Sequence, residues 1–259
     1  MFLFFYFSHL FCNFAALIVI KHSTDMPIKT TLYSLLMLLL PLTALAQKVT
    51  ITASYNVRED DVLKPMETSG DFEGEAPLDV SFAPVCDGIG DHTPAYEWHF
   101  RKEGATQDLL VRYDEQTQYT FTESGAWIVT LKTRLTDIGA DLDSTSIKVT
   151  ISESKLEFPN AFSPNDDKVN DIYRAKQPDG VKSIVEFHAY IFNRWGQKLY
   201  EWTDPYGGWD GNYKGNPVKE GVYFVLVKAR GADGREYNIR KDVNLLRTYI
   251  QSETNSSSQ

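Results

Sequence analysis

The sequence predicts an all-β protein in which a signal peptide is followed by two tandem β-sandwich domains. Short runs of alternating apolar and polar residues recur from residue 49 to residue 246, and turn residues such as Asn and Gly separate them. No stretch shows an apolar repeat of helical period. Alternation of this kind places every second side chain in a core, as the strands of a sandwich require.

Residues 26–46 have the pattern of a secretory signal peptide. Lys29 precedes an apolar run over residues 32–42, and the small residues Ala44 and Ala46 follow it. Cleavage after Ala46 would release the mature protein. Because this apolar run is too short for a retained anchor, we expect no transmembrane span in the mature chain.

Residues 1–25 form a second apolar segment, rich in Phe and without a leading basic residue. Two export segments in series are unusual, so we expect translation to begin at Met26. The alternative is an additional transmembrane helix, for which the segment is long enough.

The net charge and the cysteine count limit the binding partners and the disulfide bonds that the chain can have. The chain has 35 acidic and 26 basic residues and a formal net charge of −9, which argues against nucleic acid or an anionic membrane as a partner. Cys12 lies in the segment that export removes, so Cys86 is left without an intramolecular disulfide partner. We expect Cys86 to be a buried small hydrophobe.

The first predicted domain covers residues 48–154. Its alternating runs lie at residues 49–55, 78–82, 96–100, 126–131 and 147–151. Trp98 and Trp127 take inward positions in this alternation, so we expect both in the core. Residues 152–155 form a short polar linker to the second domain.

The second predicted domain covers residues 156–247 and contains two predicted hairpins. Residues 184–192 alternate and are followed by a turn at 193–196 and a second β-prone run at 198–202. Residues 222–227 are apolar on both faces, which favours a central strand. Asp-Gly at residues 233–234 predicts a two-residue primed turn to a return strand.

Several motifs of the second domain occur in a fixed order. They lie at residues 158–166, 170–171, 192–196, 209–211, 221–223 and 245–247. Together they resemble the gliding motility-associated C-terminal domain, which is the type B sorting domain of the type IX secretion system of Bacteroidetes-type bacteria.

The resemblance implies a function for the second domain. It implies that the domain directs the exported chain through the periplasm and across the outer membrane by the type IX translocon. A partner outer-membrane β-barrel protein would then hold the chain at the cell surface. The implied motif positions are Asn193, Arg194, Trp195 and Gly196 in one turn, Trp209, Asp210 and Gly211 in a second, and Leu245, Leu246 and Arg247 in the terminal strand.

The first domain is similar to a PKD domain, an immunoglobulin-like sandwich. The similarity rests on residues 74–78, the strand 98–100 and residues 124–131. It implies a spacer or interaction module. Because only one small sandwich precedes the sorting domain, we expect the protein to be an accessory component of the secretion or gliding machinery rather than a delivered enzyme.

An oxygen-rich loop is the one candidate metal site. Carboxylate and amide oxygens of this kind suit calcium, although the same residues also hold turns by bonding the local backbone. The candidate ligands are Asn165, Asp166, Asp167, Asn170 and Asp171. Lys168 within the loop would oppose a cation, and we expect no cofactor elsewhere.

The sequence favours no enzyme. It contains no Gly-x-Ser-x-Gly elbow, no phosphate loop and no pair of histidines at metal-ligand spacing. The alternative function is a small adhesin or carbohydrate-binding protein that uses Trp202, Tyr206 and Trp209. We expect instead that Trp195, Trp202 and Trp209 pack over Gly196, Gly208 and Gly211 at the ends of the sandwich. The polar tail at residues 248–259 is predicted to be disordered.

Overall fold

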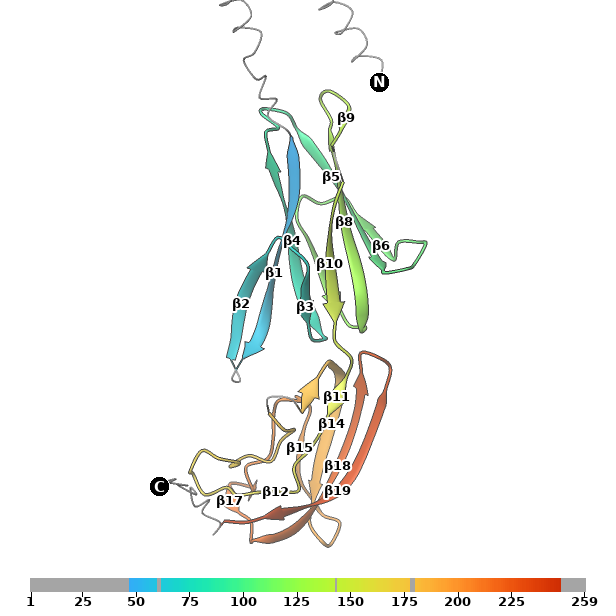
Figure 1. Ribbon diagram of the computed structural model, residues 1–259. Helices are drawn as coiled ribbons and strands as arrows, with labels where there is room; N and C mark the ends of the chain where they lie inside the picture. The colour runs from blue at the N-terminus through green and yellow to red at the C-terminus, as the bar shows by residue number, and fades with distance from the viewer. Residues whose placement is uncertain (1–46, 60–61, 143, 178–179, 248–259) are drawn as a thin grey trace, which may run out of the picture. The chain divides into compact units, whose positions relative to one another are not determined.

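The computed structural model describes residues 47–59, 62–142, 144–177 and 180–247 (Figure 1). The predicted signal peptide and the tail after Arg247 lie outside the described residues. Every element of the described residues is a strand, which confirms the all-β prediction. Within the described ranges, no helix has the length and apolarity that a membrane crossing needs.

The first sandwich consists of two sheets. One has the strand order β2-β1-β4-β7, and the other has the order β3-β10-β8-β5-β6 with β9 added beside β8. The strands are β1 (Lys48–Glu59), β2 (Val62–Thr68), β3 (Phe72–Gly74), β4 (Leu78–Asp87), β5 (Pro94–Lys102), β6 (Leu110–Arg112), β7 (Thr117–Phe121), β8 (Gly125–Leu135), β9 (Ala140–Asp141) and β10 (Thr145–Ile151). Most neighbours are antiparallel, whereas β3 pairs with β10 in parallel.

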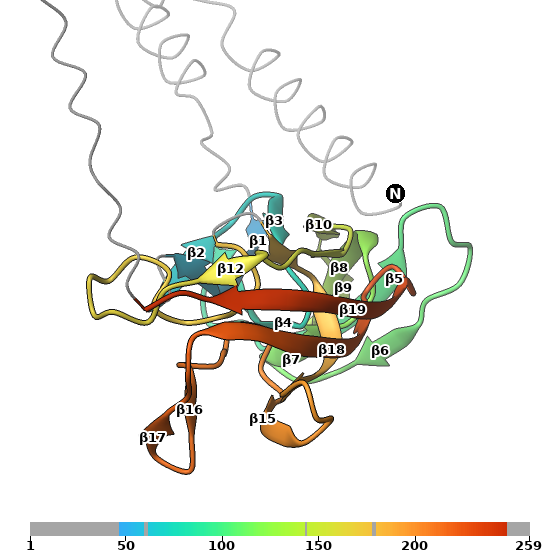
Figure 2. The same cartoon turned by 90° about the horizontal axis from the view of Figure 1, so that it is seen from below.

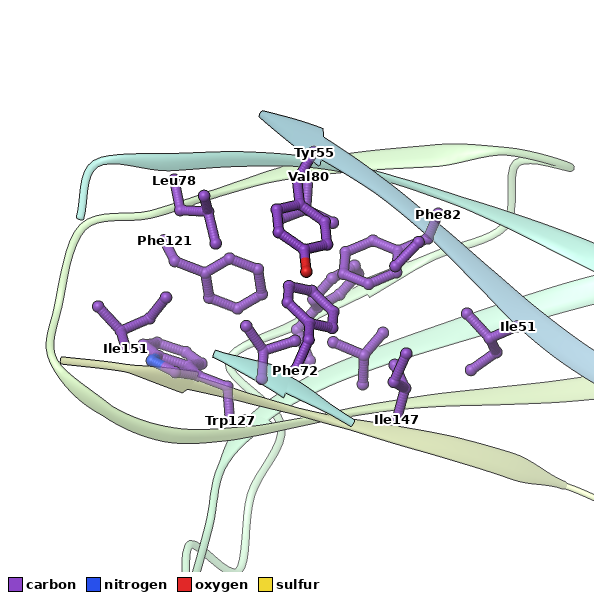
Figure 3. Packing of buried hydrophobic residues seen from close by; sticks show 14 of the residues in the cluster. Ile51, Tyr55, Phe72, Leu78, Val80, Phe82, Phe121, Trp127, Ile147 and Ile151 are labelled. Atoms are coloured by element: carbon purple, nitrogen blue, oxygen red, sulfur yellow. The ribbon is translucent and has the colours of Figure 1, made fainter. Parts of the chain in front are cut away.

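An aromatic core fills the space between these two sheets (Figure 3). Phe82 contacts the ring of Phe100 edge to face at 5.8 Å, and Phe121 meets Trp127 in the same way at 5.6 Å. Trp98 and Trp127 are both buried, as the alternation predicts. Their indole N–H groups donate to backbone carbonyls, so neither polar tip is left unsatisfied.

All five runs that the sequence predicts for this domain are strands. The structure adds β2, β3, β6, β7 and β9. Of these, β2 has no alternation because six of its seven residues are exposed. Cys86 is only partly buried, contrary to the expectation of full burial. Its Sγ lies 3.8 Å from the hydroxyl oxygen of Tyr96, at the edge of the core.

The second sandwich is built on one five-stranded sheet of order β12-β19-β18-β14-β15. Two-stranded sheets formed by β11 with β13 and by β16 with β17 accompany it. The strands are β11 (Lys155–Leu156), β12 (Ala161–Phe162), β13 (Val181–Lys182), β14 (Ile184–Phe192), β15 (Lys198–Trp202), β16 (Asn212–Tyr213), β17 (Asn216–Pro217), β18 (Gly221–Gly231) and β19 (Glu236–Leu245). Figures 1 and 2 both show β18 beside β19.

Only one face of the five-stranded sheet carries the core of the second sandwich. Ala189 and Ile191 of β14 and Val225 and Val227 of β18 are buried on that face, together with Val243 of β19. The β18 residues on the other face are exposed, except for the half-buried Leu226. Strand β18 is therefore central, as predicted, but it is not covered on both faces by the described residues.

Both predicted hairpins are present, and one turn differs from the prediction. Strands β14 and β15 pair antiparallel around residues 193–197, with a bulge beside Phe192. The turn between β18 and β19 has three residues rather than two. The amide of Gly231 donates to the carbonyl of Arg235, and Gly234 alone takes a left-handed φ of 80°. A loop with one left-handed glycine needs no positive φ at Asp233, which removes the need for a primed turn.

Candidate recognition surface

The β14–β15 hairpin ends in a turn that Asn193 fixes. The Asn193 side-chain oxygen accepts hydrogen bonds from the amides of Trp195 and Gln197, both at 3.0 Å. The Asn193 amide donates to the carbonyl of Gln197, and Gly196 closes the turn with a φ of 78°. Asn and Gly are the residues that provide such bonds and such a φ at low cost. The predicted turn is therefore confirmed.

Trp195 projects from this turn into solvent. Its side chain is 82% exposed, and the Arg194 guanidinium lies 5.5 Å from the centre of its ring. The expectation that Trp195 packs over Gly196 at the end of the sandwich is wrong. The reason is that the backbone of the turn and the Asn193 side chain already complete the hydrogen bonds, so the indole is not needed to close the turn.

In the second turn motif, by contrast, the tryptophan is buried. Trp209 is fully buried, and its indole N–H donates to the carbonyl of Asn212 at 2.8 Å. Its ring meets Tyr223 edge to face at 5.1 Å. The backbone of Trp209 exchanges two hydrogen bonds with Tyr173, and Gly211 takes a φ of 77° beneath it. This part of the expectation, a tryptophan that closes the sandwich, agrees with the structure.

Asp210 and Arg247 hold the loops around Trp209. The Asp210 carboxylate accepts from the backbone amide and the side-chain amide of Asn212. The Arg247 guanidinium donates to the carbonyls of three loops, those of Pro164, Gly211 and Val218. Its five donors are well suited to a convergence of carbonyl oxygens.

The predicted terminal strand divides into buried and exposed positions. Leu245 is fully buried and is the last residue of β19, whereas Leu246 lies beyond the strand and is exposed. Of the ten motif residues, Trp195 and Arg194 are thus the pair in the first turn that faces solvent, while Trp209, Gly211, Leu245 and Arg247 build the domain.

The oxygen-rich loop is folded around one carboxylate. Asp171 accepts from the amides of Asn165, Asp166 and Lys168 at 2.7 to 2.8 Å. Burial opposes the charge of Asp171, but these hydrogen bonds outweigh it and lower the pKa of the carboxyl. Lys168 takes a left-handed φ of 68°.

The other oxygens of this loop also have local partners. Asp167 accepts from the amide of Val169 and from the side chain of Asn165, and the φ values of Asp166 and Asn170 are left-handed. Among the described residues, no group of three His, Cys, Asp or Glu side chains could hold a metal ion. The loop geometry is that of a turn held by its own side chains.

The proposed glycan platform is wrong for two of its three residues. Trp202 and Trp209 are buried in the core of the second sandwich, so neither offers an open ring face, and Tyr206 is partly buried. Other aromatic residues of the second sandwich are more open. Trp195, Tyr200 and Phe224 are exposed, and Tyr190 and Phe192 are half-buried on the outward face of β14. The sequence signal for Phe224 was the run at residues 222–227, which is apolar on both faces.

The comparisons with known proteins give one family match. Residues 156–241 match the CHU_C type IX secretion signal domain. No curated protein matches the sequence.

Solved structures share only a loose likeness. SGBP-B of the mixed-linkage glucan utilization locus of Bacteroides ovatus, solved with a mixed-linkage heptasaccharide, is 14% identical with a TM-score of 0.26 and is aligned over 69% of this chain and 43% of its own. Drosophila N-cadherin EC1-4 is 10% identical with a TM-score of 0.24, over 72% and 52% of the two chains. This chain therefore spans about half or less of either protein.

The matched residues contain both turn motifs, the oxygen-rich loop and most of the five-stranded sheet, so the match and the geometry concern the same folded unit. Within this unit, residues 156–241 are identified as a CHU_C type IX secretion signal domain.

Proposed function

We propose that this chain is a non-enzymatic exported protein whose second sandwich directs it through the type IX secretion system to the cell surface. The observation that carries the proposal is the match of residues 156–241 to the secretion signal domain. A translocon would recognise the folded domain by its surface and its strand edges, and no bond in the chain would need to change.

The proposal extends to the partners and to the first sandwich. An outer-membrane β-barrel protein would retain the secreted chain at the surface, and the first sandwich would be the module that is displayed there. Its two sheets close on an aromatic core, which suits a spacer or interaction module. We expect the chain to act as an accessory component of the secretion or gliding machinery rather than as a delivered enzyme.

The test is the location of the protein in a host that has the type IX system. The full chain and a chain without residues 156–259 are expressed, intact cells are treated with added protease, and the fraction degraded is measured. We expect the full chain to be degraded and the shortened chain to stay protected in the periplasm. Equal protection of both chains would refute the sorting role.

A further inference from the structure

The outward face of the five-stranded sheet carries an apolar strip that no described residue covers. Strand register places Phe192 opposite Phe224 and Tyr190 opposite Leu226. Phe224 is 46% exposed, and Val222 at the start of β18 is 48% exposed. The strip is therefore contiguous across β14 and β18, while the reverse faces of the same strands are buried in the core.

Ring contacts order this strip. Tyr190 stacks on His188 with 4.4 Å between ring centres and lies 6.2 Å from Phe192. The Lys198 ammonium lies 5.8 Å from the centre of the Tyr190 ring. A line of aromatic rings along one strand is a preformed surface, because rings held by neighbours lose little freedom when a partner binds.

Three residues beyond Phe192, the turn that follows β14 carries the exposed Trp195. This indole sits on a turn that Asn193 holds from within, and Gln197 of the same turn donates to the hydroxyl of Tyr213 in the β16–β17 hairpin at 3.1 Å. Exposed Trp, Tyr and Arg side chains on a rigid support are the residues that dominate binding at protein interfaces. The turn is stable without the indole, so its exposure has no role in the fold itself.

The charges at this tip are opposite in sign to those of the chain. The Arg194 guanidinium lies over the ring of Trp195, and the Lys214 ammonium lies 5.3 Å from the ring of Tyr213. The chain as a whole has a formal charge of −9. A partner that meets this tip gains from carboxylates around an apolar pocket, whereas a second copy of the chain would bring cation against cation if it packed tip to tip.

We propose that Trp195 and the strip of Tyr190, Phe192, Val222, Phe224 and Leu226 form the surface by which a protein of the secretion machinery grips this domain. That protein presents an apolar pocket for the indole with an acidic rim for Arg194. This inference rests on the proposed sorting function and deepens it, since it names the surface that is read.

The experiment uses the full chain in a host with the type IX system and measures protease accessibility on intact cells. The variants are Trp195→Ala and Phe224→Thr, and the control is Tyr113→Ala, which removes a ring that is 71% exposed in the first sandwich. We expect each of the two variants to lower surface display about tenfold, the effect of losing an interface anchor, and the control to leave it unchanged.

Thermal unfolding of the purified variants shows that a loss of display is not a loss of folding. A photoreactive amino acid at position 195 should crosslink to a protein of the secretion machinery, and the same amino acid at position 113 should not. The chain without residues 156–259 separates the two proposals. If it stays in the periplasm while Trp195→Ala and Phe224→Thr are displayed like the parent, this surface is refuted and the sorting role stands.

If the shortened chain is displayed as well, both proposals fail. A purified chain that is a dimer in light scattering and becomes a monomer on Trp195→Ala would overturn the proposal in favour of a second copy as the occupant.

Discussion

The two tryptophan turns of the second sandwich use similar residues for opposite purposes. One combines Trp195 with Asn193 and Gly196, and the other combines Trp209 with Asp210. In each, a side-chain oxygen accepts backbone amides two residues on, and a glycine takes a φ near 78°. Yet the exposed fraction of the indole is 82% in the first turn and 0% in the second.

The difference shows that the local sequence determines the conformation of the turn but not whether its tryptophan is buried or exposed. Trp209 is buried because Tyr173 pairs with its backbone and Tyr223 packs on its ring, and both partners come from distant parts of the chain. The first turn stands at the tip of a hairpin, with Gln197 and Tyr213 beside it, and its indole remains outside. Trp209 thus packs in the core of the domain, whereas the ring of Trp195 remains accessible to a partner.

Trp209→Ala tests this comparison most severely. Removal of a fully buried Trp should cost about 3 to 5 kcal/mol of unfolding free energy, through lost burial and an unfilled cavity. Trp195→Ala should change stability by no more than about 0.5 kcal/mol, as exposed substitutions do. Denaturant unfolding of both purified variants measures the difference. Equal losses of stability would mean that Trp195 also packs against the domain.

Alanine at the two glycines of these turns should also differ in its cost to the free energy of unfolding. Alanine at Gly211 must adopt a left-handed φ, and its Cβ would lie 3.1 Å from side-chain atoms of Leu245 and Pro164. Strain and overpacking together should cost about 3 kcal/mol. Gly196→Ala meets nothing within 4 Å, so the strain alone should cost about 1 kcal/mol. Urea unfolding of both purified variants measures this difference. Equal losses of unfolding free energy for Gly211→Ala and Gly196→Ala would contradict the explanation.

The substitution Asp171→Asn tests whether the stability of a turn held by a carboxylate depends on pH. Asn193 and Asp171 both hold a turn by accepting backbone amides, but only Asp171 titrates. Its pKa is lowered because its hydrogen bonds outweigh the effect of burial. The stability that it adds is therefore present above its unfolded pKa of about 3.9 and is lost as pH falls through its folded pKa.

The measurement is the melting temperature of the parent and of Asp171→Asn between pH 2 and pH 7. We expect a gap of a few degrees at neutral pH that closes below about pH 4. Asn193→Asp is the matched control for a second anchored turn. A gap of constant size over the whole range would show that the carboxylate charge does not hold the loop.

Much of the fold could be predicted because it follows from the local alternation of apolar and polar residues. Alternation found the long strands and the hairpin at residues 193–197, and it placed Trp98 and Trp127 in the core. Strand β2 could not be found in this way, because a strand that is exposed on both faces shows no period.

The site was less predictable, because burial depends on partners that the local sequence does not name. Oxygen-rich residues at 165–171 fitted both a ligand set and a turn held by its own side chains, and the local sequence did not show that Asp171 accepts from three amides of its own loop. The run at residues 222–227 was apolar on both faces and suggested a doubly covered strand. Val222 and Phe224 are instead exposed, so the same pattern also fits a strand with an uncovered apolar face.

The pairing of β12 with β19 joins the beginning of the second sandwich to its end. Among the described residues, β12 pairs with β19 alone. The carbonyls of Pro164, Gly211 and Val218 accept hydrogen bonds from the guanidinium of Arg247. A ribosome that has not yet delivered residues 236–247 leaves the sheet unclosed and these three acceptors without their donor. The fold of the second sandwich is therefore complete only once synthesis has passed Arg247.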